Sequence, residues 1–93
     1  MPNDPASKSR LARAQGCLLG QLAGDALGAL VEFKSPDEIR QLYPEGVRKL
    51  ADGGTFNTLA GQPTDDSELA LLLARSLVEH GTYDAQAVRC LLY

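Results

Sequence analysis

Glycine occurs at every fourth position in the stretch GCLLGQLAGDALGALVEF, residues 16–33. Apolar residues recur around these glycines with helical periodicity, so the sequence predicts a helix from about Ser9 to Val31. Because four residues are close to one helical turn, the glycines form a nearly continuous row along that helix. Each glycine inside a helix costs about 0.5–1 kcal/mol relative to alanine. The row therefore indicates a surface that neighbouring backbone or a ligand approaches closely.

Three further helices are predicted, and no convincing strand. In SPDEIRQLYP, Ser35 and Glu38 have the spacing of a capping box, and Pro44 ends this short helix. The stretch TDDSELALLLARSLVEHG has acids in its first turn and Gly81 as its C-terminal stop. Asp84 is placed to cap a last helix, AQAVRCLLY. The fold class expected from these patterns is all-α.

Residues 44–63 lie between the second and third predicted helices, and glycine and proline punctuate them without helical or alternating periodicity. A structureless loop of about 20 residues is uncommon in a compact domain unless it has a function. We therefore expect this loop to contribute to a binding site.

The length of 93 residues limits the chain to one small domain. Its formal net charge is −3. The acidic balance gives no electrostatic footprint for nucleic acid or an anionic membrane. No apolar run approaches the roughly 18–20 residues needed to span a bilayer, and no signal peptide is evident. Cys17 and Cys90 lie in apolar surroundings, which favours buried free thiols in a reducing compartment and a cytoplasmic location.

The strongest chemical candidate is GQPTDDSE, where Thr64, Asp65 and Asp66 place a hydroxyl and two carboxylates at a loop-to-helix junction. One interpretation is purely structural, because Thr and Asp are favoured caps and acids in the first turn oppose the helix dipole. The other interpretation is a cation site. Contiguous hard oxygen ligands beside a flexible loop are also what Mg²⁺ or Mn²⁺ prefers.

A second candidate is the pair Asp25 and Glu32, which are seven residues apart. On a continuous helix two turns would place both acids on nearly the same face, in the region where the glycines leave room. They form either a solvated acidic side of an amphipathic helix or part of a crowded site.

Together these segments resemble the N-terminal part of the ADP-ribosylglycohydrolase family, which includes the dinitrogenase reductase-activating glycohydrolases. The resemblance rests on the ordered combination of GDALG and VEF within residues 16–33, ADGGTF at 51–56 and GQPTDDSE at 61–68. It covers residues 13–93 and leaves residues 1–12 as a polar N-terminal segment. It implies an ADP-ribosylglycohydrolase-like helical bundle, of which this chain holds the N-terminal part.

The resemblance also implies a binuclear Mg²⁺ or Mn²⁺ centre that removes ADP-ribose from ADP-ribosylated proteins or small molecules. On that basis Thr64, Asp65 and Asp66 correspond to metal ligands, and Glu32 and Asp25 to catalytic acids beside the metals. Gly53 and Gly54 correspond to a loop that lies against the substrate. Ser67 stands where many members have threonine, and Pro63 where many have an aromatic residue.

Family members are about three times as long and complete the metal site with a second acidic cluster, which this sequence lacks. We therefore expect the chain to carry the N-terminal half of a hydrolase site, which another part or another chain completes. The alternative is a truncated, catalytically inactive helical module of the same family that serves association.

Overall fold

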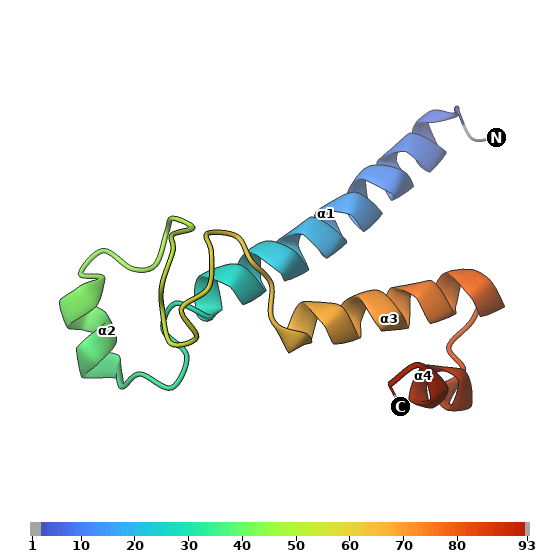
Figure 1. The fold of residues 1–93 in the computed structure, drawn as a ribbon. Coiled ribbons are helices and arrows are strands. Elements are labelled where there is room, and N and C mark those ends of the chain that lie inside the picture. The colour runs from blue at the N-terminus through green and yellow to red at the C-terminus, as the bar shows by residue number, and fades with distance from the viewer. Residues whose placement is uncertain (1–2, 93) are drawn as a thin grey trace.

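The computed structural model describes residues 3–92, which form four α-helices. In chain order these are α1 (Pro5–Gly28), α2 (Pro36–Leu42), α3 (Asp65–His80) and α4 (Ala85–Leu92) (Figure 1). Within the described residues β pairing is limited to one isolated antiparallel bridge, between Gly53 and Thr58. The all-α class predicted from the sequence is confirmed.

Helix α1 begins and ends earlier than the periodicity predicts. It begins at Pro5, because the Asp4 carboxylate caps it by accepting a hydrogen bond from the Ser7 N–H at 2.7 Å. After Gly28 the chain tightens into turns, with the Leu30 N–H bonded to the Leu27 carbonyl at 3.2 Å. The predicted end at Val31 is therefore wrong, and Glu32 lies beyond the helix.

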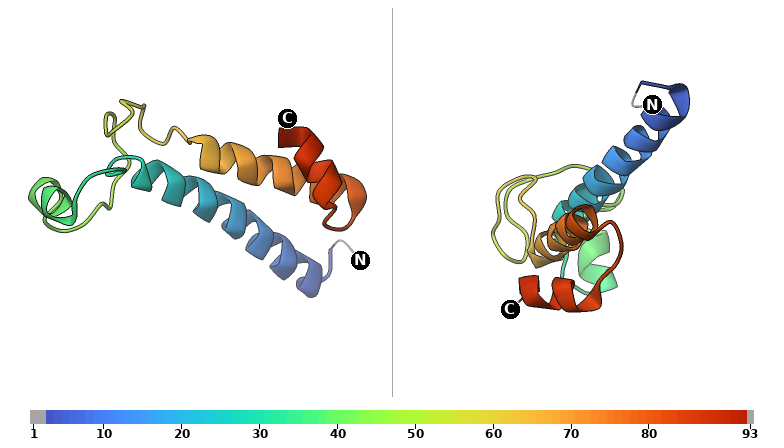
Figure 2. Two further views of the ribbon diagram at one scale, coloured as in Figure 1. Left: turned by 90° about the horizontal axis from the view of Figure 1, so that it is seen from below. Right: turned by 90° about the vertical axis from the view of Figure 1, so that its right-hand side faces the viewer.

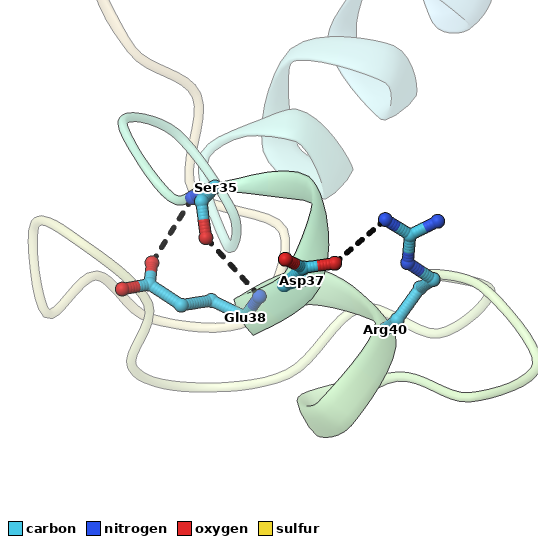
Figure 3. A network of polar contacts seen from close by, with 4 residues as sticks. All are labelled: Ser35, Asp37, Glu38 and Arg40. Carbon is cyan, nitrogen blue, oxygen red and sulfur yellow. Dashed lines mark hydrogen bonds and ion pairs between the residues drawn. The ribbon is translucent and has the colours of Figure 1, made fainter.

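Helix α2 has the capping box that the sequence predicts (Figure 3). The Glu38 N–H donates to Ser35 Oγ at 3.2 Å, and the Ser35 N–H donates to the Glu38 carboxylate at 3.0 Å. Arg40 pairs with Asp37 at 2.8 Å on the exposed side of the same helix. These bonds all lie within α2 and its cap residue.

Helices α3 and α4 also have the predicted caps. The Thr64 side chain caps α3, and Gly81 ends it in the left-handed conformation with φ +70°. The Asp84 carboxylate accepts from the Gln86 and Ala87 N–H groups at 3.0 and 3.1 Å. The predicted continuation of α4 to residue 93 lies outside the described residues.

Helices α1 and α3 run in opposite directions and diverge from a common end, where the C-terminal part of α1 meets the N-terminus of α3 (Figures 1 and 2). Helix α2 and the loop that follows it lie at that end, and α4 packs against α3. Three apolar residues are buried among the described residues: Ala26, Ala29 and Leu30. The small core therefore sits at the end where α1, α3 and the loop meet.

The loop between α2 and α3 is ordered by its own hydrogen bonds and by its contact with α1. The Asp52 carboxylate accepts from the Ala60 N–H at 2.7 Å, and Gly53 and Thr58 exchange two backbone bonds. A Cβ atom added to Gly54 would lie 2.7 Å from the Leu30 Cα, so only glycine permits this approach. The loop thus covers the end of α1.

The glycine row of α1 does not receive the predicted close neighbour within this chain. A Cβ atom on Gly16, Gly20, Gly24 or Gly28 would meet no atom within 4 Å in the part of the chain that the structure describes. Cys17 and Cys90 are free, as predicted, but both are exposed rather than buried. The sides of α1 and α4 that carry these cysteines are exposed to solvent. None of the described helices combines the length and apolar character needed to cross a membrane.

Candidate functional site

The Asp25 carboxylate joins α1 to the N-terminus of α3. Its Oδ1 atom accepts a hydrogen bond from the Thr64 hydroxyl at 2.6 Å. Its Oδ2 atom accepts three: from the Ser67 hydroxyl at 2.6 Å, the Thr64 N–H at 2.8 Å and the Ser67 N–H at 3.3 Å. A carboxylate from one helix thereby satisfies backbone donors at the start of another, which would otherwise lack partners.

These bonds also determine the charge of Asp25. Partial burial raises the pKa of the carboxyl group, but hydrogen bonds from the hydroxyl and N–H groups of Ser67 and Thr64 outweigh that effect. The pKa of Asp25 consequently lies below the ordinary value of 3.8. The group is an anion at neutral pH, held by four donors.

Ser67 and Gln21 belong to the same network, and sequence reasoning missed their part in it. Ser67 is 1% exposed, and its hydroxyl accepts a hydrogen bond from the Gln21 amide at 3.4 Å. A usable signal was the spacing, because residues three apart lie on one side of a helix, as Thr64 and Ser67 do at the start of α3. Gln21 likewise precedes Asp25 by one turn of α1.

The predicted metal ligands lie at the start of α3. Thr64 caps the helix by accepting from the Asp66 N–H at 3.4 Å, so the structural interpretation of this residue is confirmed. Asp65 and Asp66 are exposed in the first turn. Neither carboxylate forms an ion pair within residues 3–92, so both are accessible to a cation.

An open hollow of about 440 Å³ lies beside this junction, lined by Gly20, Gln21, Gly24, Asp25 and Asp66. Side chains on the two glycines would project into this space, because nothing lies within 4 Å of a Cβ at either position. Part of the glycine row therefore keeps the surface beside Asp25 and Asp66 open.

The seven-residue spacing predicted that Glu32 and Asp25 share a helix face. This prediction is wrong, because α1 ends at Gly28. Glu32 lies in the following turn, where its carbonyl accepts a hydrogen bond from the Thr55 hydroxyl. The residue is half-buried, and its carboxylate makes no hydrogen bond within the described residues. The turn and the loop thus hold the backbone of Glu32 and leave its side chain available.

Gly53 and Gly54, predicted to contact substrate, occupy the loop that covers the end of α1. Both have positive φ, +107° and +76°. Gly54 packs against Leu30 and Ala29, while the space around Gly53 is open. A contact between these glycines and a substrate stays a prediction.

The side chains at the start of α3 offer hard oxygen atoms, the type of ligand that Mg²⁺ and Mn²⁺ prefer. Among residues 3–92, however, no three His, Cys, Asp or Glu side chains gather closely enough to hold a metal ion. The oxygen atoms of Thr64, Asp65 and Asp66 suit a divalent cation in chemistry, but the described residues do not form a complete coordination shell.

The fold and the site together define an all-helical protein with an oxygen-rich helix junction beside a glycine-lined hollow. The ADP-ribosylglycohydrolase family model matches residues 6–93, so the chain belongs to the ADP-ribosylglycohydrolase family. The resemblance seen in the sequence motifs is confirmed.

Individual relatives agree with this assignment. An ADP-ribosyl-[dinitrogen reductase] glycohydrolase of Rhodospirillum rubrum is 51% identical over 73 residues, covering 77% of this chain and 24% of the relative. An ADP-ribosylarginine hydrolase (Tri1) of Pseudomonas putida is 38% identical over 97 residues, covering 89% and 24%. The corresponding hydrolase of Serratia proteamaculans is 36% identical over 85 residues, covering 91% and 21%. The chain spans about a quarter of the length of these relatives.

Proposed function

We propose that this chain supplies the N-terminal part of a divalent-cation-dependent hydrolase that removes ADP-ribose from ADP-ribosylated proteins or small molecules. The observation that carries the proposal is the family match over residues 6–93. The names of two relatives specify dinitrogen reductase and arginine as the modified groups, which makes a modified protein side chain the first substrate to test. We expect the reaction to take place in the cytoplasm.

In this proposal Thr64, Asp65 and Asp66 hold Mg²⁺ or Mn²⁺, as part of a binuclear centre when the site is complete, and Glu32 lies beside the metals. A bound cation would supply a water of lowered pKa and an anchor for the ribose hydroxyls. The unbonded Glu32 carboxylate is suited to accept a proton from such a water. Carboxylates beside the anomeric carbon stabilise the cation-like state through which the glycosidic bond breaks.

Gly53 and Gly54 are assigned to contact with the substrate. Their loop is fixed against the end of α1 through Gly54 and through the bond between Thr55 and the Glu32 carbonyl. The same segment therefore carries the glycines and holds the backbone of the proposed base. A ligand that contacts the loop would therefore lie near the backbone of Glu32.

The proposal is tested on the full-length gene product with an ADP-ribosylated arginine peptide, by measuring ADP-ribose release with Mg²⁺ and with Mn²⁺. Asp65→Ala combined with Asp66→Ala should lower turnover by more than the 10–100-fold typical of losing a partner outside the ligand shell. Added metal should raise the melting temperature of the parent protein and not that of the variant.

Asp37→Asn is the matched control, because it also removes carboxylate charge but lies in an exposed pair with Arg40 on α2. It should leave turnover and metal-dependent stabilisation unchanged. Absence of ADP-ribose release by the parent protein, with no effect of metal on its melting, would overturn the proposal. That result would favour the alternative, a helical association module, which the many exposed leucines of this chain support.

A further inference from the structure

The Asp25 carboxylate is nearly saturated by this chain's own donors. An ionised carboxylate offers about four acceptor positions, two on each oxygen. The three bonds to Oδ2 and the one to Oδ1 leave at most one position, on Oδ1. Asp25 therefore has little capacity left to bind a cation or to take a proton from water.

Asp25 does determine the direction of the Thr64 hydroxyl proton. A hydroxyl has one proton and two lone pairs. The proton goes to Asp25 Oδ1 at 2.6 Å rather than to Asp66 Oδ2, which is 3.5 Å away. One lone pair of Thr64 Oγ1 accepts from the Asp66 N–H at 3.4 Å, and the other is left free for another partner. Donation to an anion also makes the oxygen a more basic ligand, as outer partners do at metal sites generally.

Residues of α3 hold the Asp25 side chain in place, and one of them, Ser67, is itself bonded to Gln21 of α1. The buried Ser67 hydroxyl donates to Asp25 Oδ2 at 2.6 Å while accepting from Gln21. The backbone N–H groups of Thr64 and Ser67 converge on the same oxygen. These bonds set the orientation of the first turn of α3, which carries Asp65 and Asp66.

We propose that Asp25 is a positioning residue, which acts through Thr64 and does not itself contact metal or substrate. It orients the Thr64 hydroxyl so that the remaining lone pair of the oxygen is presented to the divalent cation. This inference rests on the proposed function and replaces a directly catalytic role for Asp25 within it.

Asp25→Asn separates this role from a general structural one. The amide oxygen of asparagine would take the place of Oδ2, where three donors converge, which leaves the NH₂ group facing Thr64. The Thr64 hydroxyl would then have to accept a hydrogen bond, and its proton would turn toward the position of the cation. Because the helix N-terminus stays capped, the metal-free melting temperature should change little.

The decisive measurement is a double-mutant cycle on the full-length gene product, with Mn²⁺ and Mg²⁺ affinity determined by calorimetry. Asp25→Asn alone should weaken metal binding about 10–100-fold. In a Thr64→Val background, which has no hydroxyl to orient, Asp25→Asn should have almost no further effect. Thr64→Ser keeps the hydroxyl and should preserve the sensitivity to Asp25→Asn.

Equal losses of affinity from Asp25→Asn in the parent protein and in the Thr64→Val background would overturn the inference, because they would mean that Asp25 acts on the cation directly. No loss in either background would overturn it as well. In both cases metal-dependent turnover that is abolished by Asp65→Ala with Asp66→Ala would leave the proposed function standing. If the parent protein binds neither metal, the proposed function fails and the inference fails with it.

Discussion

At the level of single residues, glycine has two different roles in this chain. The glycines of α1 border open space, and two of them line the hollow beside Asp25 and Asp66. Gly54 instead lets backbone meet backbone, where the loop contacts Leu30 at a distance that excludes a Cβ atom. The loop glycine is thus required by packing inside this chain, whereas the helical glycines keep a surface clear.

Replacement of Gly54 by alanine should therefore destabilise the fold more than replacement of Gly61. The two residues have nearly the same φ, +76° and +80°, so alanine pays about 1–2 kcal/mol at either position for the left-handed conformation. A Cβ on Gly61 would meet Leu50 at an ordinary 3.6 Å, whereas one on Gly54 would collide with Leu30. The collision should add about 1–3 kcal/mol.

The measurement is the free energy of unfolding in urea for the two variants of the full-length gene product, with the parent protein as reference. Gly61→Ala controls for backbone strain, so the difference between the variants isolates the steric contact. Equal destabilisation by the two substitutions would show that the loop does not approach Leu30 this closely.

The candidate site was only partly predictable at this scale. The position of Thr64, Asp65 and Asp66 at a loop-to-helix junction followed from the sequence, because caps and first-turn acids are local features. The partnership of Asp25 with Thr64 did not, since it joins residues 39 positions apart and depends on how two helices meet. Ser67 appeared in the sequence only as a residue that departs from a family pattern.

At the level of elements, the starts of α2, α3 and α4 were the most predictable features, because each is fixed by side chains within a few residues. The capping box of α2 and the caps of α3 and α4 are as predicted. The end of α1 was predicted less well. It is set by turns at residues 29–34 that pack under the loop, so the periodicity of α1 alone carries no signal for it.

The start of α1 should depend on pH through Asp4. The pKa of this carboxyl lies below its ordinary value of 3.8, and the main cause is the hydrogen bond from the Ser7 N–H. Since the folded-state pKa is depressed, the cap is fully present above the unfolded pKa and is lost as the pH falls through the folded value. The first turn of α1 should therefore fray in acid, as followed by the Cα chemical shifts of residues 6–8.

Asp4→Asn is the matched variant for this experiment. Asparagine caps helices about as well as aspartate but does not titrate in this range. The same chemical shifts should then stay constant over the pH range in which those of the parent protein change. Identical pH curves for the two proteins would mean that Asp4 does not control the start of α1.

At the level of the whole molecule, the described fold is extended. Its radius of gyration is 16.9 Å, whereas a compact domain of this length has a value of about 12 Å. Its accessible surface is 7241 Å², against about 5200 Å² for a compact protein of this mass. The two long helices diverge instead of closing over a common core (Figure 2).

Helix α3 shows which surface lacks a cover. Leu69, Leu73 and Leu77 recur every four residues along one side, and all three are more than a third exposed. Leu71 and Val78 are exposed on another side of the same helix. A helix that is apolar on several sides is typical of the interior of a larger helical body. Exposed apolar surface of this extent is rarely left uncovered in solution.

The 93-residue chain, produced by itself, should therefore self-associate as its concentration rises, in sedimentation velocity experiments. Leu69→Gln combined with Leu73→Gln should shift it toward the monomer, because the association is driven by the apolar side of α3. Arg75→Gln, a change on the same helix that removes no apolar surface, should leave the association unchanged. A chain that stays monomeric throughout would show that this surface does not need a partner. Sedimentation of the full-length gene product then distinguishes what covers the apolar side of α3. The protein should sediment as a monomer if its own polypeptide covers α3, and as an oligomer if a second copy does.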